Sequence, residues 1–140
     1  MGLNPLMKVA GATLALLALG GCADKQVTAF VCDETTHSHF RGNDMGDSSA
    51  KVTFILDLRH RQLWQMSDDG KPYVVCGGCK LNVDDRKIET TGDGRRSFSF
   101  DRDKGTGHKS ESDPEFTYER TEAGCHSVSV PAEFWPKRKI

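Results

Sequence analysis

The stretch VTFILDL at residues 52–58 carries the pattern that decides the fold. The apolar residues at its odd positions alternate with Thr53, Ile55 and Asp57. Successive side chains of a β-strand point to opposite faces of the sheet. This alternation therefore predicts a strand with one buried face and one face nearer to solvent.

Short segments of the same period occur elsewhere in the chain. Phe98 and Phe100 alternate with serines, and turn formers such as SDDGKP at 67–72 separate one segment from the next. Two strands are expected to form a hairpin about the Gly-Gly pair at 77–78. The polar stretch at 33–50 is expected to be a long surface loop. The chain is thus predicted to be all-β, a small antiparallel β-barrel or compact sandwich of about eight short strands.

The N-terminal sequence, MGLNPLMKVAGATLALLALGGC, has the order of a secretory signal. Basic Lys8 precedes an apolar run at 9–19, and two small residues lead to Cys22. The run is too short to span a bilayer, which takes about 20 residues. Its end, Leu-Gly-Gly-Cys at 19–22, resembles the lipobox of bacterial lipoproteins. In that family the cysteine is acylated, and cleavage would fall here between Gly21 and Cys22.

This resemblance implies a chain tethered to a membrane by lipid on Cys22, because two or three acyl chains anchor a protein stably. Ala23, in the place where such lipoproteins carry an inner-membrane aspartate, implies the outer membrane, with the domain on its periplasmic or surface side. The expected divisions are a signal at 1–21, a lipidated tether at 22–29, a single β domain at 30–135 and a basic tail at 136–140.

Charge limits the classes of partner. Loss of Lys8 with the signal takes the formal net charge of the chain from −1 to −2, and acidic and basic residues are interspersed. A near-neutral surface of this kind argues against nucleic acid as a ligand. The membrane is one expected partner, through the lipid, and a protein or small envelope ligand is the other.

The cysteines other than Cys22 form an even set, which predicts two disulfides in an oxidising compartment. They are Cys32, Cys76, Cys79 and Cys125. Three pairings are open from sequence alone, and pairing of the first and last strands would favour Cys32 with Cys125. Cys76 and Cys79 have the C-x-x-C spacing of thiol redox sites, but strand-like segments flank them rather than a helix. A structural disulfide is therefore expected there, over redox activity or zinc binding.

Other groups with potential chemistry fall in predicted loops and turns. His37 and His39 would point the same way from an extended segment, which suits a metal or substrate contact, but solvated side chains are expected. The aspartates at 84–85 and at 101–103 are expected to cap turns. No enzyme signature accompanies them, so no catalytic residue, cofactor or metal is predicted.

The function expected is that of a non-catalytic binding or interaction domain in the cell envelope. An early and a late cysteine around many short strands resemble the plan of the membrane-bound inhibitors of c-type lysozyme. The Ser-Gly loop and downstream tyrosine of that family have no counterpart in this chain. A lysozyme inhibitor, an envelope-assembly lipoprotein and a periplasmic thiol protein are the alternatives. For an assembly role, exposed Phe134 and Trp135 are the predicted partner contacts.

Overall fold

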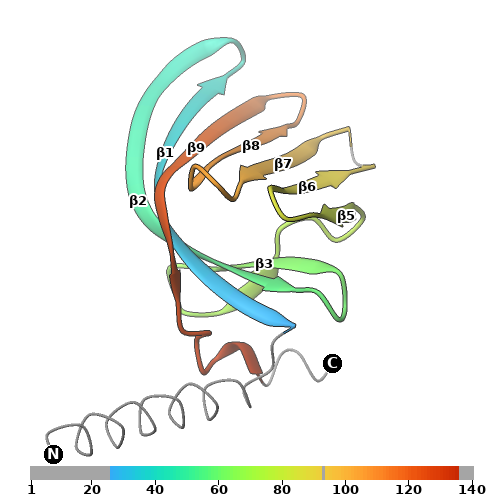
Figure 1. Ribbon diagram of the computed structural model, residues 1–140. Helices are drawn as coiled ribbons and strands as arrows, with labels where there is room; N and C mark the ends of the chain where they lie inside the picture. Colours follow the sequence, from blue (N-terminus) through green and yellow to red (C-terminus); the bar gives the residue numbers. More distant parts are fainter. Residues whose placement is uncertain (1–25, 93, 136–140) are drawn as a thin grey trace, which may run out of the picture.

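The computed structural model describes residues 26–92 and 94–135, which form one antiparallel sheet curled into a half-barrel (Figure 1). The strands of this part of the chain are β1 (Val27–Phe40), β2 (Asn43–Asp57), β3 (Gln62–Met66), β4 (Pro72–Val74), β5 (Lys80–Val83), β6 (Lys87–Thr91), β7 (Arg96–Asp101), β8 (Thr106–Ser112) and β9 (Phe116–Val128). No helix within the described ranges has the length and apolarity needed to cross a bilayer. The predicted all-β fold is confirmed. The predicted lipidation site Cys22, the predicted cleavage site and the predicted basic tail at 136–140 lie outside the described residues.

The strands follow the order β4-β3-β2-β1-β9-β8-β7-β6-β5 across the sheet. Neighbours in sequence are neighbours in the sheet at every step except one, from β4 to β5. The first strand pairs with the last, as Glu34 opposite Glu122 illustrates. The strands β4 and β5, although consecutive in the chain, form the two opposite edges of the sheet.

The hairpin expected about the Gly-Gly pair at 77–78 is therefore wrong. β4 pairs with β3, and Val75 extends that contact by donating its N–H to Leu63 O at 2.8 Å. β5 pairs instead with β6 on the other wall of the curl. The local turn signal is overridden because each flanking strand has a stronger partner elsewhere, and the segment between them crosses from one wall to the other.

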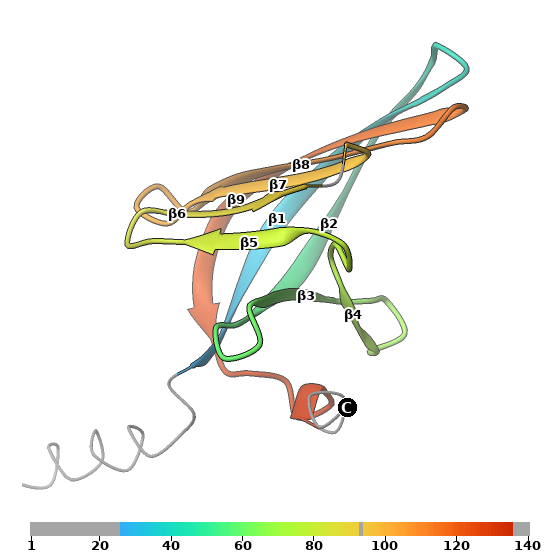
Figure 2. The same ribbon diagram turned by 90° about the vertical axis from the view of Figure 1, so that its right-hand side faces the viewer.

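The loop expected at 33–50 is also wrong, because this stretch forms the long hairpin of β1 and β2. Arg41 and Gly42 both have positive φ, 49° and 80°, which is the conformation of a tight two-residue hairpin turn. β1 also pairs with β9 along its other side, as far as Phe40 opposite Phe116. Hydrogen-bonding partners on both sides of β1 thus keep a polar sequence extended, and Figure 2 shows the resulting arm projecting from the body of the sheet.

Alternate residues along the strands are apolar, face the concave side and meet there. They form what we call the apolar cluster: Phe30, Cys32, Val52, Phe54, Leu56, Leu63, Leu81, Ile88, Phe98 and Phe100. The alternation predicted for 52–58 is confirmed for Val52, Phe54 and Leu56, whereas Leu58 follows the end of β2 and is exposed. Aromatic rings join the two walls, with centroids 4.6 Å apart for Phe30 and Phe100 and 5.3 Å apart for Phe54 and Phe98.

A second, smaller apolar group lies on the convex side at the start of β1. Ile55 faces outward yet is fully buried, because the segment after β9 covers it with Phe134. Phe134 is 0% exposed and packs edge-on against Trp64, with ring centroids 5.5 Å apart. An exposed partner contact at Phe134 is therefore wrong, and Trp135 is itself partly buried against the same group.

Both predicted disulfides are present, Cys32–Cys125 and Cys76–Cys79. The first joins β1 to β9, in agreement with pairing of the first and last strands. Gly105 lies so close to this bridge that a Cβ there would be 2.9 Å from Cys125 O. The second closes the segment that leads from β4 to β5, and no helix begins at it.

Candidate functional site

The apolar cluster fills one end of the concave side of the sheet. The other end is polar and open. A cavity of about 560 Å³ lies there, within the range of about 300 to 1,000 Å³ that is usual for small-ligand sites. Its lining includes Glu34, Gln65, Tyr73, Lys109, Tyr118 and Arg120. Several strands from both walls of the half-barrel therefore contribute to one concave site.

The direction of these side chains follows from strand periodicity and register. Glu34 lies two residues after inward-facing Cys32 on β1, so it faces the same side. Lys109 pairs with Phe98 of the apolar cluster, and paired residues share a face. Gln65 pairs with Phe54 in the same way. We call the four residues Glu34, Gln65, Lys109 and Arg120 the charged cluster.

Lys109 is the centre of the charged cluster. Its Nζ donates to Gln65 Oε1 at 2.6 Å and lies 3.5 Å from Glu34 Oε2. It also lies 5.5 Å from the centroid of the Phe54 ring, a cation–π contact. Since β2, β1 and β9 separate β3 from β8 in the sheet, the bond to Gln65 crosses the concave interior. Burial lowers the pKa of Lys109, and the charge of Glu34 opposes that shift.

Arg120 extends the charged cluster toward the open end. Its Nε lies 3.8 Å from Glu34 Oε1, its Nη1 lies 3.7 Å from Glu111 Oε2, and its guanidinium lies 5.1 Å from the Tyr118 ring centroid. The Arg120 side chain is 21% exposed, against 7% for Glu34. Arg120 is thus the member of the cluster that a molecule in the cavity reaches most easily.

Glu122 forms a buried pair of carboxyl groups with Glu34, its register partner. Burial raises the pKa of Glu122 to about 8, with further contributions from a hydrogen bond to Glu34 and from its charge. Neither Glu122 oxygen, nor Glu34 Oε2, receives a hydrogen bond from a donor among the described residues. A proton on Glu122 accounts for both facts, because the protonated carboxyl donates to Glu34.

Gly107 provides the space that Glu122 occupies. A Cβ at this position would lie 3.2 Å from Glu122 Oε2 and 3.1 Å from the Phe100 ring. Glu122 is 1% exposed and is not part of the cavity lining. Its raised pKa therefore belongs to a buried pair beneath the site, and no substrate in the cavity meets this carboxyl.

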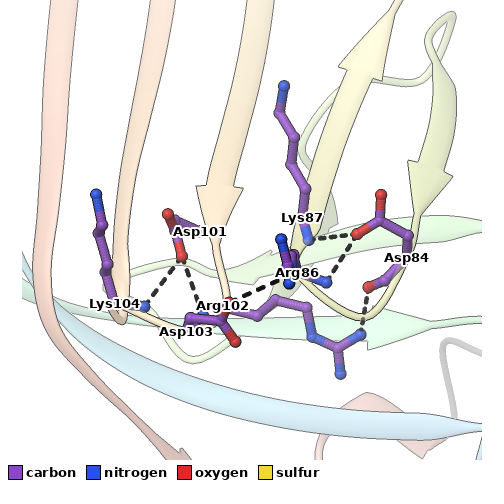
Figure 3. A network of polar contacts seen from close by, with 7 residues as sticks. All are labelled: Asp84, Arg86, Lys87, Asp101, Arg102, Asp103 and Lys104. Carbon is purple, nitrogen blue, oxygen red and sulfur yellow. Dashed lines mark hydrogen bonds and ion pairs between the residues drawn. The ribbon is translucent and has the colours of Figure 1, made fainter.

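Two of the aspartates expected to cap turns, Asp84 and Asp101, do so (Figure 3). Asp84 Oδ1 accepts the N–H groups of Arg86 and Lys87, each at 2.7 Å. Asp101 Oδ1 accepts those of Asp103 and Lys104, each at 3.0 Å. These hydrogen bonds stabilise the β5–β6 and β7–β8 turns, and they occupy the carboxylates in backbone contacts.

His37 and His39 lie near the tip of the β1–β2 hairpin, on the convex side. The ring of His37 contacts the carboxylate of Asp47, and this hydrogen bond raises the pKa of His37. Neither histidine lines the cavity, although their chain neighbours Thr36 and Ser38 on the opposite face of β1 do.

Gln65, Lys109 and Arg120 are site residues that sequence reasoning missed. Lys109 follows the alternation of β8 between Gly107 and Glu111, but that pattern alone does not say which face is buried. The register of β7 with β8 supplies this information, and it is a property of the folded sheet.

Comparison with protein-family models, with curated proteins and with solved structures found no match to the chain.

Proposed function

We propose that the chain is a cell-envelope lipoprotein whose β domain binds a polar ligand or a segment of a partner protein in the concave cavity, without chemistry of its own. The observation that carries the proposal is a buried group of charges at the wall of an open cavity. Lys109 and Glu34 are 8% and 6% exposed, and both line the cavity.

Buried charges of this kind contribute little to the stability of a fold. The desolvation of two ions can exceed their mutual attraction, and replacement by apolar residues is often neutral or stabilising by about 1 to 4 kcal/mol. Lys109 and Glu34 lie 3.5 Å apart at the wall of the cavity, beside the more exposed Arg120, so their charges are placed where a ligand can meet them. A binding role therefore explains the cluster better than a structural role.

The charges of the lining suggest the chemistry of the ligand. Lys109, Arg120 and Arg96 offer positive charge, and Glu34 and Glu111 offer negative charge, all around one cavity. Mixed charges favour a ligand that carries both acidic groups and hydrogen-bond donors. Tyr73 and Tyr118 add aromatic walls against which its apolar parts can pack.

The edges of the sheet are a less suitable place for a partner. β4 has three residues and begins with Pro72, and β5 has four residues and begins with Lys80. Short edge strands with proline and lysine are devices that discourage addition of a further strand. We therefore place the binding site in the cavity rather than at an edge.

A lipid on Cys22 would keep this site close to one membrane. The Cys22→Ser variant is expected to move from the membrane fraction to the soluble fraction, because a chain without lipid keeps no anchor. Immunoblots of the fractions measure this, with Cys79→Ser as a control that should stay in the membrane. Full retention of the Cys22→Ser variant would exclude the lipid anchor.

Site-specific photo-crosslinking in cells tests the cavity. Ser48 lines it, whereas Ser49 is the next residue of β2 and points to the opposite face. A benzophenone amino acid at position 48 is expected to capture a ligand or partner, and the same group at position 49 serves as the matched control. Equal adducts from both positions, or none from position 48, would contradict the proposal.

A further inference from the structure

The tip of the β1–β2 hairpin gathers a set of metal-ligand side chains that the cavity does not use. His37, His39 and Asp44 each offer one ligand atom, and these atoms all lie within 4.8 Å of one another. The arm that carries them stands clear of the body of the sheet (Figure 2). None of the three lines the concave cavity, so they form a separate feature of the convex side.

A β-bulge brings these residues to one face. His37 pairs with Asp47, but His39 pairs with Asp44, so β1 has one residue between the pairs and β2 has two. Residues three apart on a regular strand point to opposite faces. The extra residue of the bulge, with Gly46 at φ 86°, reverses this and places Asp44 and Asp47 on the same side as both histidines.

The distances suit a small divalent ion. A tetrahedral ion with ligands at about 2.05 Å holds its ligand atoms roughly 3.3 Å apart. His37 Nε2 lies 3.6 Å from Asp44 Oδ1, and the rings of His37 and His39 have centroids 4.7 Å apart. Small rotations of exposed side chains are enough to bring the three ligand atoms to this spacing.

Asp47 and Glu119 lie next to the three ligand residues and support their arrangement. Asp47 contacts Nδ1 of His37, which leaves Nε2 free to face an ion, as in the carboxylate–histidine–metal arrangement of many metal sites. Asp44 accepts the N–H of Gly46 at 2.7 Å, so its carboxylate is oriented by the bulge. Glu119 on β9 pairs with His37 and adds negative charge to the same face.

We propose that His37, His39 and Asp44 bind one divalent transition-metal ion of the zinc, copper or nickel class, with Asp47 as a positioning residue. Two imidazoles and one carboxylate are ligands that such ions prefer, whereas magnesium and calcium prefer oxygen ligands alone. Three protein ligands leave at least one coordination position for water or for a group from another molecule. The site is independent of the cavity and of the function proposed for it.

Titration calorimetry and native mass spectrometry of the full-length chain in detergent test the proposal. The protein carries no polyhistidine tag and keeps its disulfides, and zinc chloride is the probe, with magnesium chloride as the comparison. We expect one zinc ion per chain and no magnesium. His39→Ala and Asp44→Ala should abolish the heat of zinc binding. Asp47→Asn should weaken the affinity for zinc by about 10- to 100-fold, as is usual for residues that support a metal ligand.

His126→Ala is the matched control, because His126 is also exposed and lies on β9 outside the cluster. It should bind zinc like the unmodified chain. Unfolding temperatures should be unchanged in all variants, since the tip lies outside both buried apolar groups. The proposal is overturned by absence of zinc binding, or by binding that survives His39→Ala and Asp44→Ala.

Discussion

The two ends of the concave face use the same curled backbone for different purposes. At one end, aromatic rings from both walls pack at centroid distances of 4.6 and 5.3 Å and fill the space. At the other end, one hydrogen bond from Lys109 to Gln65 joins the walls, and a cavity remains. The apolar cluster is thus expected to supply most of the free energy of folding. The charged cluster is expected to contribute little to stability and to serve binding.

The largest effect is expected from Phe98→Ala at the apolar end. Phe98 is 1% exposed, and loss of a buried phenylalanine side chain costs about 3 to 5 kcal/mol in transfer and cavity terms. Denaturant unfolding measures the change. Met45→Ala is the control, because Met45 is 61% exposed and should change stability little. Similar changes in both variants would contradict the assignment of the core.

A smaller change in the free energy of unfolding is expected from pH, through the titration of Glu122. Its pKa is raised from 4.5 to about 8, so in this window the native chain holds a proton that the unfolded chain has lost. Stability should therefore fall as pH rises from about 4.5 to about 8.

Glu122→Gln should remove this slope and make the chain more stable than the unmodified protein near pH 8, because the amide has no charge to bury. Free energies of unfolding at several pH values measure both effects. Glu115→Gln, which changes a half-exposed surface carboxyl, should keep the original slope. An unchanged slope in Glu122→Gln would show that another group is responsible.

A still smaller loss of stability is expected from Gly107→Ala, which lies between the apolar cluster and the charged cluster. The added methyl group would meet Glu122 and the Phe100 ring at 3.2 and 3.1 Å, and overpacking of this kind costs about 1 to 3 kcal/mol. Gly78→Ala is the control, because no atom lies within 4 Å of its Cβ position. Equal unfolding temperatures for the two variants would contradict the close packing around Glu122.

The two ends also differ in how far they follow from the sequence. Alternation in 52–58 and at Phe98 and Phe100 predicts the apolar cluster, because a two-residue period is itself the signature of a half-buried strand. The same period does not identify the charged cluster. Lys109 is directed inward by the register of its strand, and register depends on the whole sheet.

Local signals fail where tertiary pairing competes with them. The polar stretch at 33–50 forms strands because β9 supplies hydrogen bonds along the other side of β1. The Gly-Gly pair at 77–78 makes no hairpin because β3 and β6 take the strands beside it. The cysteines alone leave three disulfide pairings open, and the Cys32–Cys125 bridge is favoured only through the expected pairing of the first and last strands, which the sheet confirms.

The double variant Glu34→Leu/Lys109→Met tests most directly whether the charged cluster serves binding rather than stability. The free energy of unfolding and the photo-adduct from position 48 are measured on the same protein. We expect stability to be unchanged or higher by about 1 to 4 kcal/mol, because apolar residues replace buried ions, and we expect the adduct to be lost. A loss of stability as large as that of Phe98→Ala, with the adduct retained, would contradict the account.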